Sequence, residues 1–428
     1  MVEFSSFNGY GVKDAKVRQY VITPQMYGAK GDGVTDDTQA IKTAIARHSA
    51  VFFPRGTYLV SDTLILQNQK ISGAGASYTT LVMTAQDVTK PIIRAHRSTV
   101  IEDIRLSFAE GLVTGNEAVG ERVCILSTTI EEQGYWSLQR GGAIRNVIFS
   151  NCGTAVHGDI FSFTFDTLEI EHYSCHGFWL TGGTQNMISN VYFGFNKYSP
   201  WDALILDGET GSYMDCINVE HCLFRSSPII FRNCAGFTVD SMHLEGIGCT
   251  ANYNSYIAFH KSSGVINDLS VFFTRIQTQG CAIMELGTVG HTFPDNAVAG
   301  TDYCRIKINN LNLVGLGMPD WATYPDWPED KKGLNNAPEF KVAYRKNEWE
   351  GTYYLEVDNY NYATFMDDAE IYENFPYTSW KITALKLGTV NTVGTTEARP
   401  TKRLVKGRTQ YFDTTLGKMV TWNGSNWV

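Results

Sequence analysis

The sequence is short of charged residues and of long hydrophobic runs, and both shortages exclude classes of protein. Of the 428 residues, 18% are charged, the formal net charge is -9, and the longest basic block is RLVKGR near Arg403. The charge therefore does not indicate nucleic-acid binding. No stretch approaches 18 apolar residues, so no membrane span is expected. The first residues lack the basic and apolar segments of a signal peptide.

Motifs for metals and cofactors are also missing. The chain has nine cysteines but no CxxC spacing. Several cysteines fall at turn or core positions of the repeats described below, and we interpret them as buried reduced thiols: Cys152, Cys175, Cys216, Cys222 and Cys234. There is no P-loop, GxSxG or zinc motif, and no aspartate-rich ladder for calcium. We therefore expect neither a metal nor a cofactor.

What the sequence does contain is one short pattern, repeated eight times. Each copy has an apolar residue, a small polar pair and then alternating apolar residues, and the copies are IEDIRLS (101–107), IRNVIFS (144–150), FDTLEIE (165–171), ISNVYFG (188–194), MDCINVE (214–220), VDSMHLE (239–245), INDLSVF (266–272) and INNLNLV (308–314). The central intervals are 21, 23, 26, 25 and 27 residues. A period of this length with a period-two core is typical of a solenoid of short strands.

A second column of apolar pairs follows the first at a similar offset. Its members are Val156 and Gly158, Phe178 and Leu180, Leu204 and Leu206, Ile229 and Phe231, and Ile257 and Phe259. Two or more strands per turn, all coiling in one direction, make a parallel β-helix, which is an all-β fold. Leucine-rich or helical repeats fit less well, because the copies carry Asn, Thr, Cys, Val and aromatic residues without helical spacing.

A glycine-rich block precedes the repeats. YGAKGDGVTDDTQAI begins at Tyr27, and FPRGTYLV follows from Phe53. Thr35, Asp36 or Asp37 can cap a helix that runs to about Arg47. This block resembles the opening of the pectate-lyase-like superfamily of right-handed single-stranded parallel β-helices, in which such a helix closes the first end of the solenoid. The resemblance implies the fold and leaves the reaction open, because pectin-degrading enzymes and many phage tailspikes share it.

Changes in composition divide the chain into four parts. We expect a lead-in over residues 1–25, the β-helix over 26–317, a linker with a small antiparallel β module over 318–388, and a tail over 389–428. The tail reads as two short strands around an LGK turn. Its YFDTTLGK and WNGSNWV segments resemble the ends of phage tail fibre and tailspike proteins. Two long insertions, 110–141 and 287–302, are expected to carry binding or subunit contacts, and the first holds Glu131, Glu132, Tyr135 and Trp136.

Outward positions of the repeats give the first candidate site. In the predicted frame Glu171, Glu220 and Glu245 share one column, and the neighbouring column supplies Glu169, Tyr192, Asn218 and His243. Turns of a solenoid lie ~4.8 Å apart, which would put Glu220 and Glu245 about 5 Å apart and Glu171 about 9.5 Å from Glu220. Both spacings suit a glycosidase, so the three glutamates are the predicted catalytic residues. A polar ladder kept for solubility explains the same pattern.

A second candidate site lies at the next edge. It combines Asp207 and Glu209 of LDGETG with aromatic and basic side chains, and its further members are His157, Asp159, Trp179, Arg232 and His260. Of these, Trp179 and Asp207 are predicted to bind substrate.

The resemblance and the glutamates together predict a function. We expect a tailspike-like depolymerase in the virion, a homotrimer attached to a phage tail or baseplate protein, that hydrolyses a bacterial surface polysaccharide. A polysaccharide lyase would need a His, Tyr, Lys or Arg base and a cation to neutralise a uronate. A non-catalytic adhesin would bind the same glycan without cutting it.

Overall fold

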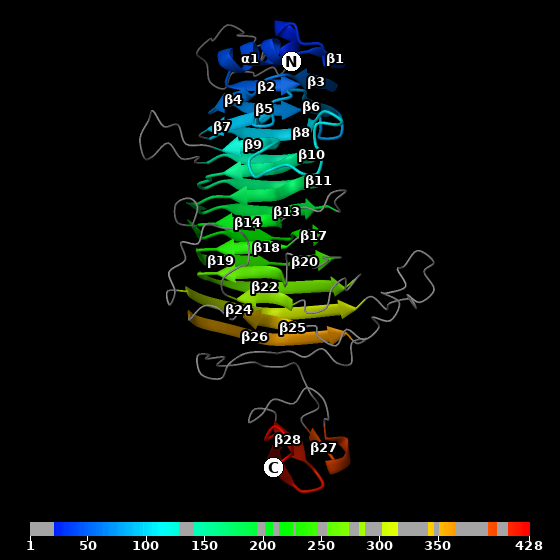
Figure 1. Ribbon diagram of the computed structural model, residues 1–428, viewed down its shortest axis with the longest axis vertical. Coiled ribbons are helices and arrows are strands. Elements are labelled where there is room, and N and C mark those ends of the chain that lie inside the picture. Colours follow the sequence, from blue (N-terminus) through cyan, green and yellow to red (C-terminus); the bar gives the residue numbers. More distant parts are fainter. Residues whose placement is uncertain are drawn as a thin grey trace, which may run out of the picture.

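A computed structural model describes residues 21–96, 98–127, 141–194, 202–208, 214–225, 228–245, 255–273, 282–286, 302–315, 341–345, 351–363, 393–399 and 410–428. The strands stack in parallel, and each turn of chain lies below the one before it (Figure 1). The fold is the predicted parallel β-helix. In the described residues no helix is long and apolar enough to cross a membrane.

Three sheets form the walls of the solenoid, and longer strands bend from one sheet into the next. The glutamate sheet, named for Glu169 and Glu171, contains β1 (Asp32–Asp36), β3 (Gly56–Val60), β6 (Thr79–Met83), β8 (Val100–Phe108), β10 (Ala143–Gly158), β11 (Thr164–Leu180), β13 (Met187–Phe193), β17 (Leu223–Arg225), β20 (Met242–Glu245), β22 (Ser262–Phe273), β24 (Asp302–Gly315) and β26 (Gly351–Ala363).

The tryptophan sheet, named for Trp179, contains the ends of β10 and β11 together with β4 (Leu64–Gln67), β7 (Ile93–His96), β9 (Val123–Ser127), β14 (Asp202–Asp207), β18 (Ile229–Arg232), β21 (Ser255–His260), β23 (Ala282–Leu286) and β25 (Lys341–Arg345). The third sheet contains the first parts of the long strands and β2 (Ala50–Phe53), β5 (Lys70–Gly73), β12 (Gly183–Thr184), β15 (Met214–Asp215), β16 (Asn218–Glu220) and β19 (Cys234–Asp240).

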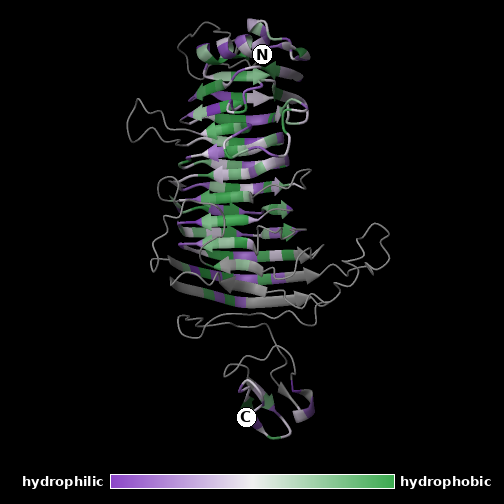
Figure 2. Ribbon diagram, in the orientation of Figure 1, coloured by the Kyte–Doolittle hydropathy of each residue, from purple (hydrophilic) through white to green (hydrophobic). Residues whose placement is uncertain are grey.

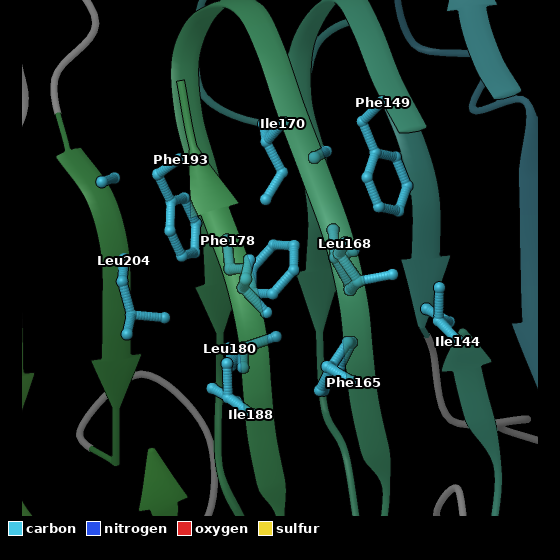
Figure 3. Close-up of a cluster of buried hydrophobic side chains, with 14 of the residues drawn as sticks. Ile144, Phe149, Phe165, Leu168, Ile170, Phe178, Leu180, Ile188, Phe193 and Leu204 are labelled. Carbon is cyan, nitrogen blue, oxygen red and sulfur yellow. The ribbon is translucent and has the colours of Figure 1, made fainter. Parts of the chain in front are cut away.

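The core lies between the three sheets, because alternate side chains of each strand point inward. Hydrophobic bands recur on strand after strand (Figure 2). Phe178 packs against Phe165 and Phe193 with ring centroids 5.1 Å and 5.2 Å apart (Figure 3). Phe193 also stacks on Phe224 at 4.6 Å. The second apolar column is confirmed, since Val156, Phe178, Leu204, Ile229 and Ile257 are successive partners in register.

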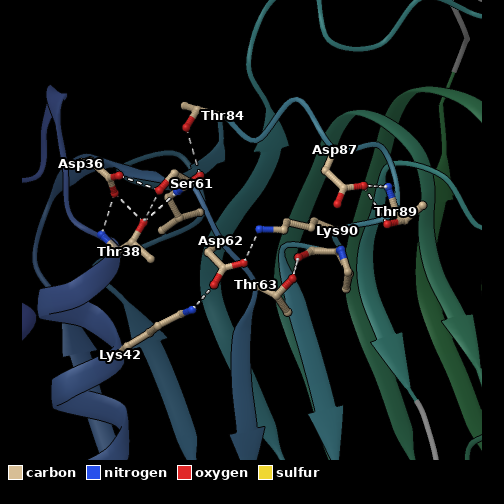
Figure 4. Close-up of polar contacts among 12 residues, drawn as sticks. Asp36, Thr38, Lys42, Ser61, Asp62, Thr63, Thr84, Asp87, Thr89 and Lys90 are labelled. Atoms are coloured by element: carbon tan, nitrogen blue, oxygen red, sulfur yellow. Dashed lines mark hydrogen bonds and ion pairs between the residues drawn. The ribbon is translucent and has the colours of Figure 1, made fainter.

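The predicted helix covers the first end of the coil. A short 3₁₀ turn, η1 (Pro24–Tyr27), precedes it, and α1 (Thr38–Arg47) buries Ile41, Ala44 and Ile45. Asp36 accepts a hydrogen bond from the Thr38 amide at 2.9 Å and one from Ser61 (Figure 4). Asp37 accepts from the amides of Lys30 and Gly31 at 2.6 Å and 2.9 Å. Both aspartates therefore stabilise the segment that leads into α1.

Beyond residue 317 the strands differ from the sequence prediction. β25 and β26 pair in parallel with β23 and β24, so these strands extend the solenoid instead of forming an antiparallel module. Alternating apolar residues serve either kind of pairing, which is why the pattern misled. In the tail, β28 (Gln410–Asp413) and β29 (Lys418–Thr421) form the expected hairpin, joined by β27 (Val393–Gly394) and η5 (Thr396–Ala398).

The described cysteines are free thiols, as predicted, and most are buried. Cys234 donates to the carbonyl oxygens of Leu206 and Arg232 at 3.2 Å and 3.3 Å, so its thiol bonds to the backbone at a turn of the coil. Cys216 is exposed, which corrects the expectation that it is buried. Glu209 and most of the two long insertions, including Glu131, Glu132, Tyr135 and Trp136, lie outside the described residues.

Candidate functional site

Strand register corrects one repeat of the predicted frame. Glu220 pairs with Ser189 on one side and Asp240 on the other, within the third sheet. The strand that continues the glutamate sheet is β17, where Arg225 is the partner of Glu245. Glu220 and Glu245 are therefore not neighbours in one column, and the predicted spacing of about 5 Å between them is wrong.

The turns explain the error. The proper column of left-handed turn residues runs through Asn190, His221 and Ser241, with φ of 54°, 50° and 55°. Cys216 is also left-handed, with φ of 50°, but it belongs to the preceding corner, beside Gln185. A left-handed turn followed by a period-two strand therefore occurs at two corners of the same coil. MDCINVE was assigned to the wrong one, and VEHCLFR (219–225) is the matching copy.

The charged and aromatic outward side chains of two neighbouring columns define the glutamate face: Arg105, Glu169, Glu171, Tyr192, Arg225, His243 and Glu245. Glu171 and Glu245 are separated by three strand-to-strand steps, through Gly194 and Arg225, which is ~14 Å. That separation is too long for the carboxyl pair of a glycosidase. Asn218 and Glu220 lie on the third sheet and are not part of this face.

One carboxyl pair does form on the face, between Glu169 and Glu171. They are two residues apart on β11, so both point outward. Burial, followed by repulsion from and hydrogen bonding with Glu171, raises the pKa of Glu169 above its ordinary value, and Arg105 opposes this. Arg105 Nη1 lies 3.3 Å from Glu171 Oε2. The pair therefore combines a Glu169 whose pKa is raised with a Glu171 that is ion-paired to Arg105.

Tyr192 links this pair to the next cluster along the face. It is the register partner of Glu169, and its hydroxyl accepts a hydrogen bond from Arg225 Nη1 at 3.3 Å. Arg225 also binds Glu245 with two donors, Nη2 to Oε1 at 2.7 Å and Nε to Oε2 at 3.2 Å. Burial lowers the pKa of His243, and the nearby Glu245 opposes that shift.

Arg225 is the functional candidate that the sequence prediction missed. Its signal was present, because Val219–Arg225 has the same alternation of apolar residues after a polar pair, although that pair, Glu220 and His221, is larger than in most copies. The prediction chose the copy that ends in glutamate.

The tryptophan face, the outward side of the neighbouring sheet, is covered. Trp179, Ile205, Ile230 and Ala258 form a buried apolar cluster separate from the main core. Asp207 is also buried and accepts hydrogen bonds from Trp179 Nε1 at 3.2 Å and Arg232 Nη1 at 3.4 Å.

Two more members of the second candidate site are tied into this face. His157 stacks on Trp179 with ring centroids 4.8 Å apart. Burial lowers the pKa of His157, whereas it raises that of Asp159, whose carboxylate accepts a hydrogen bond from Thr181. Asp207, Arg232 and His260 are successive register partners, so the structure brings the described members of this candidate together. Their burial sets them apart from the glutamate face.

Across the described ranges, no three His, Cys, Asp or Glu side chains lie close enough together to hold a metal ion.

Comparisons with known proteins agree with this fold. Residues 25–194 match the family described as rhamnogalacturonase A/epimerase, pectate lyase-like. The preneck appendage protein of Bacillus phage PZA is 27% identical over 232 residues, which cover 53% of this chain and 25% of that protein. The matched region therefore spans about a quarter of the length of that relative.

Two solved structures have the same architecture. Tailspike protein 2 of Escherichia coli O157:H7 bacteriophage CAB120 gives a TM-score of 0.54 at 15% identity, over 80% of this chain and 43% of that one. The A-module of the Azotobacter vinelandii mannuronan C-5 epimerase AlgE6 gives 0.50 at 15% identity, over 81% and 97%. At such identities the likeness concerns the fold alone. Together with the family match, it confirms the resemblance predicted from the sequence: the chain carries a parallel β-helix of the pectate-lyase-like type.

Proposed function

We propose that this chain is a phage tail protein that binds a bacterial surface polysaccharide on its glutamate face and cleaves it. Relatives that are appendage proteins of Bacillus phages support the virion location, and the fold shared with a phage tailspike supports the same role. Attachment to a tail or baseplate protein and assembly as a homotrimer are further parts of the proposal, and both follow from that resemblance.

Glu169 carries the proposed chemistry. A glycosidic bond breaks more easily when a carboxylic acid protonates the leaving oxygen, and a carboxyl with a raised pKa can do this near neutral pH. Glu169 has the raised pKa, caused by burial and by Glu171. The proton passes from Glu169 to the bridging oxygen as the bond to the anomeric carbon breaks. Water adds its hydroxyl to that carbon, and its remaining proton goes to solvent, from which Glu169 is reprotonated.

Glu171 has a different part in this proposal. Paired carboxyl groups of glycosidases act from opposite sides of the bond that is cut, whereas Glu169 and Glu171 are two residues apart on one strand and the Glu171 carboxyl raises the pKa of Glu169. Glu171 is therefore assigned as the positioning residue that raises the pKa of Glu169. Glu245 is assigned to substrate binding together with Tyr192 and His243, and Glu220 has no role here.

A lyase is the second candidate, favoured by one contact. Arg225 donates to the Tyr192 hydroxyl at 3.3 Å. This contact holds the Tyr192 hydroxyl on the glutamate face, and a tyrosine can act as a base in β-elimination.

The test is a product assay with purified capsule and lipopolysaccharide preparations, comparing wild type, E169Q and E220Q. Hydrolysis predicts fragments that gain one water per cut, loss of activity in E169Q and retained activity in E220Q. Fragments without that water would favour the lyase. Binding without fragments would favour the adhesin, and full activity of E169Q would remove Glu169 from the mechanism.

A further inference from the structure

We infer that the glutamate face takes an uncharged stretch of glycan, so that the two sugars joined by the bond that is cut carry no carboxylate, phosphate or sulfate. This inference rests on the proposed function and adds the substrate class to it. It also separates the two candidate reactions, because β-elimination needs a carboxylate next to the proton that is removed.

The cations of the face are already bound to carboxylates. Proteins usually recognise carboxylates and phosphates with the donors of an arginine fork. Arg225 directs Nε and Nη2 to Glu245 and Nη1 to the Tyr192 hydroxyl. Arg105 faces Glu171 through Nη1. At Arg225 an anionic sugar would have to displace the Glu245 carboxylate, and at Arg105 it would lie beside the Glu171 carboxylate and be repelled by it.

The pKa shifts of two further groups on the face are toward the neutral form. Burial and the Glu171 carboxyl raise the pKa of Glu169, and burial lowers the pKa of His243. The two arginines of the face are each paired with a glutamate, Arg105 with Glu171 and Arg225 with Glu245.

The whole chain adds a weak repulsion. Its formal net charge of -9 disfavours the approach of a polyanion. The part of the face between the ion pairs is formed by the Tyr192 ring and by Gly194, whose amide bonds to the Ile170 carbonyl at 2.8 Å. An aromatic surface with a phenol suits a neutral sugar, because sugar hydroxyls both donate and accept hydrogen bonds.

The first test identifies the sugars at the cut. A glycan from the panel that is cleaved would be digested, and the two new ends would be determined by mass spectrometry and NMR. Uncharged residues on both sides are expected. A uronate, sialate or phosphorylated sugar at either end would overturn the inference while the proposed function stands. If no glycan in the panel is bound or cut, the proposed function fails, and the inference fails with it.

The second test frees Arg225 from the carboxylate that it binds. The E245Q substitution removes its carboxylate partner, so affinity for sodium oligogalacturonate should rise by about tenfold, the equivalent of one charge-assisted hydrogen bond. Affinity for the carboxyl-reduced form of the same oligosaccharide should not rise. E220Q, on the third sheet, is the matched control and should change neither affinity. An unchanged E245Q, or a wild type that already prefers the anionic form, would contradict the inference.

Discussion

Two arginine–carboxylate pairs, one on each face, show how differently the same chemistry is used. Arg225 and Glu245 on the glutamate face are 37% and 23% exposed, whereas Arg232 and Asp207 on the tryptophan face are 6% and 0% exposed. Both pairs point outward from parallel strands of one coil. Breaking the exposed pair costs little stability, and its groups can contact a ligand. Breaking the covered pair is costly, because it leaves an unpaired charge buried away from water.

This difference separates the candidate site from the structural network. Trp179 and Asp207 have the residue types of a sugar site, but their partners are each other and Arg232. Glu169 and Tyr192 are half-buried and lie on the face that keeps its polar groups near solvent. We therefore leave Trp179 and Asp207 out of the proposed site.

Removing Asp207 should have the largest effect on stability. Asp207→Ala leaves Arg232 without its carboxylate in a buried position, and such losses cost about 3–5 kcal/mol. The midpoint of urea unfolding, followed by circular dichroism, measures the change. D207N keeps an acceptor for Trp179, so its urea midpoint should lie between those of wild type and Asp207→Ala. A loss below about 1 kcal/mol would mean that water reaches this face after all.

Replacing Glu169 should have the largest effect on activity. E169Q removes the acidic proton and should lower the rate of cleavage by about 10²–10⁴-fold. Chain lengths of a cleaved glycan, measured over time, give the rate, and the urea midpoint should not fall. A decrease in activity that is accompanied by lost stability would indicate that Glu169 has a structural role, as Asp207 does, and would contradict its role in cleavage.

Breaking the exposed ion pair should change stability much less. Arg225→Ala should cost about 0.2–1 kcal/mol in the same urea experiment, because the pair is partly solvated and screened by salt. Arg232→Ala is the matched control and should cost several times more. Equal costs for the two arginines would show that the two faces do not differ in the way proposed.

The smallest effect concerns pH. The pKa of Glu169 is raised from its ordinary value of 4.5 in the folded protein. The folded state then binds this proton more tightly, so its contribution to stability is full below the unfolded pKa and is lost as the pH rises through the folded pKa.

E169Q has no such loss. Between pH 4 and pH 7 its stability relative to wild type should therefore rise by a few tenths of a kcal/mol, because the group is partly exposed. Urea midpoints of both proteins at each pH test this. A relative stability that falls with pH would mean that the pKa is lowered instead.

Much of the fold could be predicted from the sequence, and one repeat shows why the site could not. Residues 214–220 and 219–225 both contain a left-handed turn and alternating apolar residues. Periodicity distinguishes inward from outward side chains at either corner, but it does not say which corner a turn occupies. Because the prediction chose the wrong corner, it assigned Glu220 to the position that Arg225 occupies, and so placed a carboxylate where the protein has a cation.

The sequence by itself determined the solenoid, the closing helix, the apolar columns and the outward positions of Glu169 and Glu171, since all of these depend on residues close together in the chain. Only the tertiary structure decided that Arg225 meets Tyr192 and Glu245, and that Asp207 and Trp179 are covered. The reason is physical: neighbours on a β-helix face meet across successive turns. Which residues meet therefore depends on where each turn of variable length bends, and burial depends on what lies over the sheet.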